Sequence, residues 1–289
     1  MSENVKIFIE LTRLNKPIGF MLLFWPCIWG LTIAYDFSVS LAAYIFYAFL
    51  FFSGSVLMRS AGCIVNDITD RKIDKLVERT KNRPIASGKI SIFSATIYST
   101  ILCFIAFLVL INFNKFTIYM ALISMPLAFT YPLMKRFTYW PQLFLGITFN
   151  YGLVLAWISI QNQISFLPII FYIGAIFWTL GYDTIYGYQD INDDEIIGVK
   201  STSIKFKKNP KFFLYFCYSI FIFSLIIIGL LMNFKFYYYL LLSFSFVQLL
   251  YFQIHKLNTN DPLDCLNKFK SNNLLGFLIL LNLFVGKTI

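Results

Sequence analysis

Two acidic clusters stand where long apolar stretches of this chain meet polar sequence. They occupy residues 66–74 and 183–195, and together they hold eight of the 14 acidic residues. Carboxylates gathered at the edge of an apolar segment are costly unless positive charge neutralises them. Divalent cations that carry a phosphorylated ligand would supply that charge. The two clusters are therefore where we first expect chemistry.

The spacing within each cluster predicts a row of carboxylates on one helix face. Positions i, i+3 and i+7 share a face, as do i, i+7 and i+11 if the helix runs on. The residues with these spacings are Asp67, Asp70 and Asp74, and then Asp183, Asp190 and Asp194. Magnesium is usually held by one or two carboxylates together with phosphate oxygens and water. Two facing rows would therefore suit Mg²⁺ ions that bind a diphosphate.

Basic and aromatic residues accompany the acids. Cations near the clusters would neutralise the phosphate charge that the metal ions leave, and they are Arg79, Arg83, Lys135 and Arg136. This combination suits ionisation of an allylic diphosphate, because metal and cations stabilise the departing diphosphate while aromatic faces surround the allyl cation. The aromatic residues expected near that cation are Tyr131, Tyr182 and Tyr186.

Transmembrane helices must position these groups. The chain is 58% hydrophobic and 13% charged, with a mean hydropathy of +0.71, which is typical of a polytopic membrane protein. Its apolar stretches are continuous rather than alternating, so they predict an all-α membrane protein and not a β-barrel. A span needs roughly 20 apolar residues. Nine candidates are centred near 18–34, 41–64, 92–112, 117–134, 141–160, 166–187, 212–232, 236–254 and 273–287.

The positive-inside rule orients the bundle. With a cytoplasmic N-terminus, 20 of the 24 lysines and arginines fall in cytoplasmic segments. Both acidic clusters then share the cytoplasmic face, which argues against the alternative of two unrelated solvated helix ends. The formal charge of +10 is explained by the excess of lysine and arginine in the cytoplasmic loops and by their attraction to anionic lipid headgroups. Nucleic-acid binding is therefore not expected. Heavy use of Ile, Phe, Asn and Lys is typical of an AT-rich bacterial genome, so we expect a bacterial inner (plasma) membrane.

Arg59 is a charged residue within a predicted span. Such charges are expensive and commonly functional. The alternative interpretation is snorkelling to the interface, since Arg59 lies two helical turns before Asn66. We expect a functional role.

Six segments resemble the UbiA family of membrane prenyltransferases, and the resemblance runs almost from end to end. The segments are 14–19, 58–74, 79–88, 131–136, 181–194 and 198–202. The N-D-x-x-D-x-x-x-D pattern that starts at Asn66 is typical of the superfamily. The R-S-A-G-C, N-R-P and D-T-x-Y blocks narrow the resemblance to the branch that acts on aromatic acids.

The resemblance implies one domain over residues 1–289, with nine transmembrane helices around a central cavity open to the lipid bilayer and cytoplasmic Asp-rich loops near 66–91 and 188–211. It implies Mg²⁺-dependent transfer of a polyprenyl group from polyprenyl diphosphate to C3 of 4-hydroxybenzoate, an early step of ubiquinone biosynthesis. No obligate protein partner is expected. The alternatives are a related enzyme that uses homogentisate, a naphthoate, haem or a chlorophyllide, and a proton-coupled transporter.

The resemblance also implies roles for individual residues. The catalytic carboxylates would be Asp70, Asp74, Asp190 and Asp194. The metal ligands would be Asp67, Asp70, Asp74, Asp183, Asp190 and Asp194. The substrates would be bound by Arg59, Asn66, Arg79, Arg83, Lys135, Arg136 and Tyr186. Two choices stay open: Arg59 or Arg136 pairs with the acceptor carboxylate, and Asp190 either holds metal or takes the phenol proton.

Overall fold

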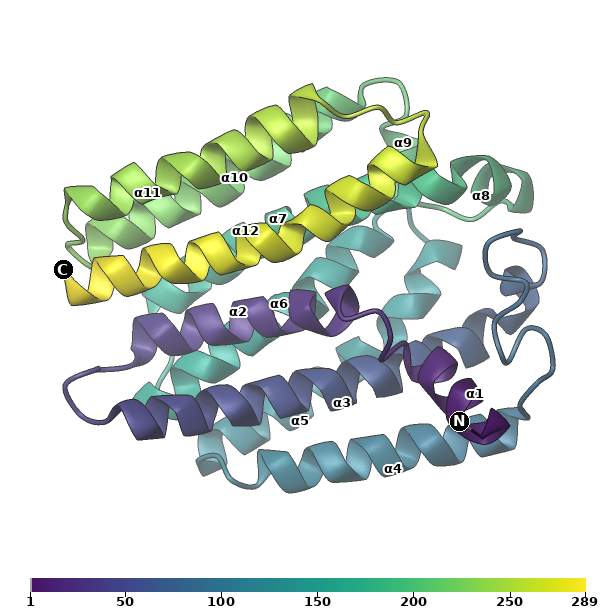
Figure 1. Ribbon diagram of the computed structural model, residues 1–289, viewed down its shortest axis with the longest axis horizontal. Helices are drawn as coiled ribbons and strands as arrows, with labels where there is room; N and C mark the ends of the chain where they lie inside the picture. The colour runs from purple at the N-terminus through teal and green to yellow at the C-terminus, as the bar shows by residue number, and fades with distance from the viewer. Residues whose placement is uncertain (1) are drawn as a thin grey trace.

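The computed structural model describes residues 2–289, and over that range the chain is helical and has no strand. The predicted all-α fold is confirmed, and Figure 1 shows the long helices lying side by side. The α-helices are α1 (Glu3–Thr12), α2 (Ile18–Ala34), α3 (Leu41–Asp74), α4 (Ile92–Leu110), α5 (Lys115–Thr130), α6 (Pro141–Gln161), α7 (Phe166–Gly187), α8 (Ile191–Ile197), α9 (Thr202–Lys205), α10 (Pro210–Leu231), α11 (Phe236–Phe246) and α12 (Pro262–Thr288). Two short 3₁₀-helices, η1 (Tyr131–Arg136) and η2 (Tyr188–Asp190), and one π-helix, η3 (Val247–His255), complete the helical elements.

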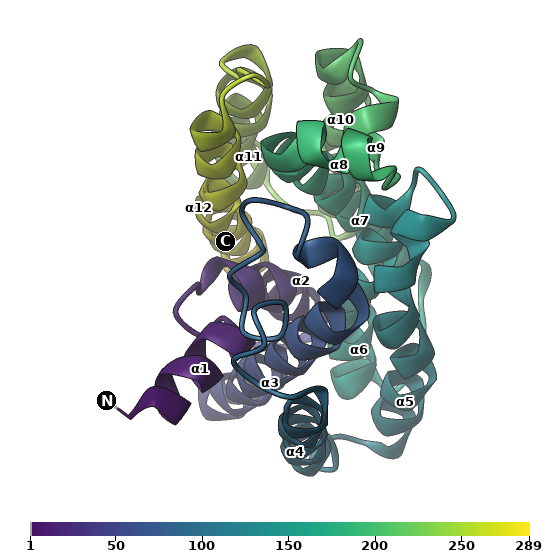
Figure 2. The same ribbon diagram turned by 90° about the vertical axis from the view of Figure 1, so that its right-hand side faces the viewer.

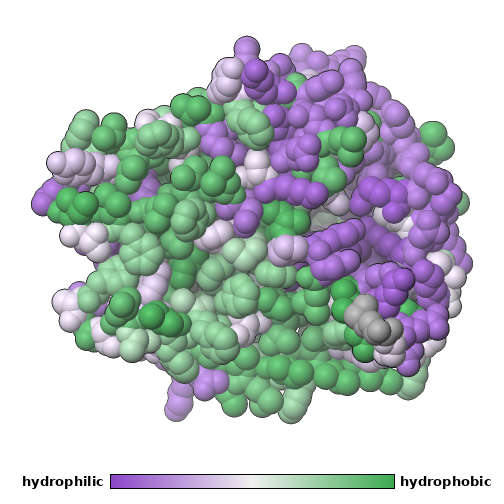
Figure 3. All heavy atoms as spheres, viewed as in Figure 1, coloured by the Kyte–Doolittle hydropathy of each residue, from purple (hydrophilic) through white to green (hydrophobic). Residues whose placement is uncertain are grey.

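Eight helical segments within residues 2–289 are long and apolar enough to cross a membrane, so this is a multi-pass membrane protein. The first predicted span forms α2, which has 17 residues and is shorter than those eight. The ninth span therefore stays a prediction. Hydrophobic residues cover much of the face in Figure 3, whereas hydrophilic ones gather at the end that carries α8 and α9.

Buried aromatic rings hold the centre of the bundle together. Helix α2 packs against α6, α6 against α7, and α7 against α10. The rings of Trp29 and Trp178 are fully buried, with centroids 5.0 Å apart, and Phe171 stacks on Trp29 at 5.6 Å. The indole N–H of Trp29 donates to the carbonyl of Gly276, which ties α2 to α12. This core sets the spacing of the helices that carry the acidic residues.

Helix α3 carries the first acidic cluster beyond the apolar part of the bundle. The side chain of Ser40 caps its N-terminus by accepting from the N–H of Ala43. Thirty-four residues at about 1.5 Å each give a length of about 51 Å, well beyond the roughly 30 Å of bilayer hydrocarbon. Residues 66–74, predicted as part of a loop near 66–91, are helical because neither glycine nor proline interrupts residues 63–74. The loop starts only after Asp74.

The second acidic cluster is divided between three elements. Helix α7 carries Asp183 and ends at Gly187, Asp190 ends the turn η2, and α8 carries Asp194. The helix therefore does not run on through all three acids, which was the condition for placing them on one helix face, and the loop expected near 188–211 contains η2, α8 and α9. A Cβ atom on Gly187 would lie 2.3 Å from Oγ of Ser203, so α9 packs directly against the end of α7, where the chain turns. Figure 2 shows α8 and α9 close to α7 and α10.

Candidate active site

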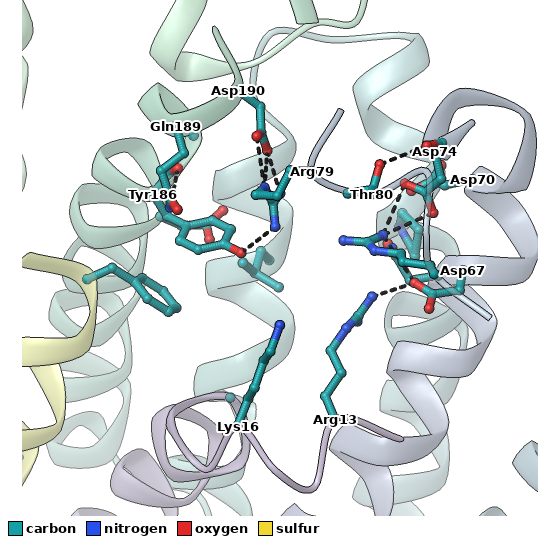
Figure 4. A pocket seen from close by; sticks show the side chains of 18 of the residues that line it. Arg13, Lys16, Asp67, Asp70, Asp74, Arg79, Thr80, Tyr186, Gln189 and Asp190 are labelled. Atoms are coloured by element: carbon teal, nitrogen blue, oxygen red, sulfur yellow. Dashed lines mark hydrogen bonds and ion pairs between the residues drawn. The ribbon is translucent and has the colours of Figure 1, made fainter. Parts of the chain in front are cut away.

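A cavity of about 980 Å³ lies between the two acidic clusters. Its lining comes mainly from α2, α3, α6, α7 and α12 and from the loop after α3. All six aspartates predicted as metal ligands line it: Asp67, Asp70, Asp74, Asp183, Asp190 and Asp194. Figure 4 shows the three acids of α3 on one side and Asp190 on another. The fold therefore brings both clusters to one cavity.

The residues predicted to bind substrate also converge on this cavity, with one exception. Those that line it are Arg59, Asn66, Arg79, Arg83, Lys135 and Tyr186. Arg136 is outside the lining, because its Nη2 donates to the carbonyl of Thr69 at 2.8 Å and its side chain is 42% exposed. Of the two candidates for the acceptor carboxylate, the structure places Arg59 in the cavity and Arg136 outside it.

Arginine and lysine side chains neutralise the buried acids of α3. Nη1 of Arg83 donates to both oxygens of Asp74 at 3.0 Å and to Asp67 at 3.2 Å. Nζ of Lys135 donates to Asp70 at 2.6 Å. Asp67 and Asp70 are each 1% exposed and Asp74 is 5% exposed. Cations expected to face phosphate thus also hold the carboxylates in place.

We expect Arg83→Met to destabilise the fold by about 3 kcal/mol, because it leaves the buried Asp74 without its ion-pair partner. Denaturant unfolding in detergent micelles measures this loss. Lys81→Met is the matched control, since Lys81 lies in the same loop and, among residues 2–289, pairs only with the exposed Glu78, and exposed pairs are worth little. Equal stability of the two variants would contradict the structural role of Arg83.

Arg79 links the loop after α3 to the second acidic cluster. Its Nε donates to the two oxygens of Asp190 at 2.8 and 2.9 Å, and Nη1 donates to the hydroxyl of Tyr186 at 3.1 Å. The backbone N–H of Glu78 donates to Asp193 at 3.3 Å. Burial alone would lower the pKa of Arg79, but the hydrogen bonds and negative charge of Asp190 outweigh it and raise that pKa. Arg79 therefore keeps its charge beside the cavity.

Five basic residues of the described cavity lining were not among the predicted site residues: Arg13, Lys16, Lys89, Lys200 and Lys270. Arg13 ends α1 with a left-handed backbone (φ 57°) and pairs with Asp67, and Lys16 belongs to the same turn before α2. Figure 4 shows both side chains extending from this turn toward the acids. A signal was present for Lys16 and Lys200, because they lie in segments 14–19 and 198–202, which carried part of the resemblance. All five had been counted only as positive charges that orient the chain in the membrane.

The acids fit metal ions that arrive with a ligand rather than a preformed metal centre. Among residues 2–289, no three His, Cys, Asp or Glu side chains gather closely enough to hold a metal ion. Magnesium, however, is commonly bound by one or two carboxylates plus substrate phosphates. Oδ1 of Asp70 is buried and accepts no hydrogen bond from the described residues. Its ion-pair partner, Nη2 of Arg136, is 3.8 Å away, so the lone pairs of Oδ1 remain for a cation.

Comparisons with known proteins agree on family and fold. The model of the UbiA prenyltransferase family matches residues 23–281. A 4-hydroxybenzoate octaprenyltransferase of Vibrio atlanticus is 39% identical and covers 99% of each chain. A mitochondrial 4-hydroxybenzoate polyprenyltransferase of Drosophila pseudoobscura pseudoobscura is 39% identical over 97% of this chain and 70% of its own. The structure of a UbiA homolog from Archaeoglobus fulgidus bound to GPP and Mg²⁺ covers 98% of this chain and 100% of its own, with 16% identity and a TM-score of 0.68.

Proposed function

Because this chain belongs to the UbiA prenyltransferase family, we propose that it transfers a polyprenyl group from polyprenyl diphosphate to C3 of 4-hydroxybenzoate, an early membrane step of ubiquinone biosynthesis. The similarity to relatives named for this reaction supports the choice of acceptor. The observation that carries the proposal is one cavity lined by both acidic clusters and by arginine and lysine side chains.

The diphosphate is proposed to bind between the two clusters with Mg²⁺. The carboxylates that would hold the metal ions are Asp67, Asp70, Asp74, Asp183, Asp190 and Asp194, and the residues that would contact the phosphates are Asn66, Arg79, Arg83 and Lys135. Bound Mg²⁺ would stabilise the negative charge that develops on the departing diphosphate. Arg13 and Lys16 join this set because they line the same cavity. Their charge favours breakage of the allylic C–O bond, whose electron pair leaves with the diphosphate.

The acceptor is proposed to lie against Arg59. A guanidinium matches a planar carboxylate with two parallel hydrogen bonds, and Arg59 is the candidate that faces the cavity. The aromatic rings of Tyr131, Phe149 and Tyr186 line the same space and would face the allyl cation. The ring carbon ortho to the phenol oxygen is the most nucleophilic. It forms the new C–C bond, and loss of the proton from that carbon restores aromaticity.

Asp190 is assigned to the diphosphate site. Both of its carboxylate oxygens already accept hydrogen bonds from Arg79, and Arg79 is a proposed phosphate ligand. Asp190 thus lies beside a proposed phosphate ligand, and we assign it to the diphosphate rather than to the phenol proton. The distribution of lysine and arginine over the loops supports a cytoplasmic position for both clusters in a bacterial inner membrane.

Mass spectrometry of the product tests the proposed function. Membranes that contain the protein, supplied with polyprenyl diphosphate, Mg²⁺ and 4-hydroxybenzoate, should yield a product heavier than the acceptor by one prenyl group less one hydrogen, substituted at C3. Homogentisate and a naphthoate serve as competing acceptors. Product from one of these and none from 4-hydroxybenzoate would reassign the acceptor. If no covalent product formed with any acceptor, the proposed transferase activity would be refuted.

A further inference from the structure

Arg59 lies in a narrow slot between two helices. On one side, its Cζ atom is 5.4 Å from the centroid of the Phe149 ring on α6. On the other side is Gly19, in the first turn of α2. A Cβ atom on Gly19 would lie 3.0 Å from Nε of Arg59, 3.5 Å from Nη2 and 3.6 Å from Cζ. The guanidinium thus fits against a surface that exists because residue 19 has no side chain.

Nothing in the backbone of α2 demands glycine at this position. Gly19 is helical and is not among the described glycines with positive φ. Alanine is a better helix former than glycine, so local preference alone would favour alanine. The three atoms nearest to an added Cβ all belong to the guanidinium of Arg59. The space at residue 19 is therefore used by Arg59.

Arg59 also has a hydrogen-bond donor that finds no acceptor among the described residues. Its Nε is buried and has no hydrogen-bond partner among residues 2–289, although Arg59 lines the cavity. A buried donor without a partner is unusual in a folded protein. A planar anion in the cavity would supply the missing acceptor.

We propose that Gly19 is a positioning residue: it lets Arg59 present its guanidinium to the carboxylate of the acceptor, an inference that rests on the proposed function. Two parallel hydrogen bonds between guanidinium and carboxylate require a fixed orientation. A methyl group at residue 19 would displace the guanidinium by a few tenths of an ångström. Because that group is the end of a flexible side chain, the fold absorbs the shift while the hydrogen bonds lose their alignment.

Steady-state kinetics of Gly19→Ala tests this role. We expect the KM for 4-hydroxybenzoate to rise about tenfold, the effect of losing roughly one charge-assisted hydrogen bond. The KM for polyprenyl diphosphate should stay within about twofold, and the thermal unfolding temperature should be unchanged or higher, because alanine favours the helix. Gly54→Ala is the matched control, since Gly54 is a helical glycine with nothing within 4 Å of an added Cβ. It should leave both KM values unchanged.

A double-mutant cycle separates positioning from a general effect on the cavity. In an Arg59→Lys background the planar fork is absent, so adding Gly19→Ala should change the acceptor KM by less than about twofold. A tenfold change in that background would overturn the inference, as would a wild-type acceptor KM in Gly19→Ala. In both cases the wild-type protein still makes product. Absence of any wild-type product with 4-hydroxybenzoate would instead refute the proposed function and this inference together.

Discussion

Replacing Asp70 with alanine is expected to abolish prenyl transfer while the protein still folds and inserts in the membrane. Asp70 is 1% exposed, accepts from Lys135 at 2.6 Å and keeps Oδ1 free of hydrogen bonds from the described residues. As a proposed metal ligand it acts when the diphosphate departs, so kcat should fall by about 10³-fold or more, equivalent to ~4 kcal/mol of transition-state stabilisation. Transfer from radiolabelled polyprenyl diphosphate measures this loss.

Two further variants isolate the charge of Asp70. Asp70→Asn keeps the shape and an oxygen that can accept from Lys135, so it should fold as the wild type does and still be inactive. Glu78→Gln is the control, because Glu78 is an exposed acid on the loop after α3 and is outside the cavity lining. It should keep wild-type activity. Full activity in Asp70→Asn would remove Asp70 from the proposed site.

Removal of divalent metal is expected to stop the reaction as completely as replacing Asp70 with alanine. The described lining of the cavity contains nine basic and seven acidic side chains. A diphosphate brings about three negative charges at neutral pH, which exceeds that small positive surplus. Without Mg²⁺ the cavity and its diphosphate would together carry net negative charge, with the phosphates close to the carboxylates of both clusters. Its binding and its departure as a leaving group should then both become unfavourable.

Treatment with excess EDTA, followed by a transfer assay, measures the metal requirement. Activity should fall by about 10³-fold or more and return when Mg²⁺ is added beyond the chelator. The thermal unfolding temperature of the substrate-free protein should not change, because its buried acids are already neutralised by Arg13, Arg83 and Lys135. Retention of more than a tenth of the activity in EDTA would contradict the proposed role of both clusters.

The helices and the acidic clusters could be predicted from sequence because both are local patterns. Long apolar stretches define spans without reference to their neighbours, and most predicted spans match helices within a few residues. The exceptions follow from local chemistry. Helix α12 begins at Pro262 rather than near 273, because its first turns are polar and lie outside the apolar stretch. Helix α3 continues to Asp74 for the same reason.

The pairing of charges in the cavity could not be predicted, because it depends on contacts between segments far apart in the chain. Arg13 meets Asp67 across 54 positions and Arg79 meets Asp190 across 111. No periodicity in the sequence records such pairs. The choice between Arg59 and Arg136 stayed open for a similar reason. Both are cations near the cluster, and only the fold shows that Arg136 turns to the carbonyl of Thr69.

The length of α3 couples the acidic residues to the membrane around them. One rigid element carries a hydrophobic stretch and, in its last two turns, the carboxylates. Where the hydrophobic stretch settles in the bilayer therefore fixes the height of the carboxylates above the lipid headgroups. Hydrophobic mismatch shifts or tilts such helices. A thinner bilayer would raise the acids further into water, and a thicker one would draw them toward the headgroups. Bilayer thickness therefore controls how far the carboxylates stand above the headgroups.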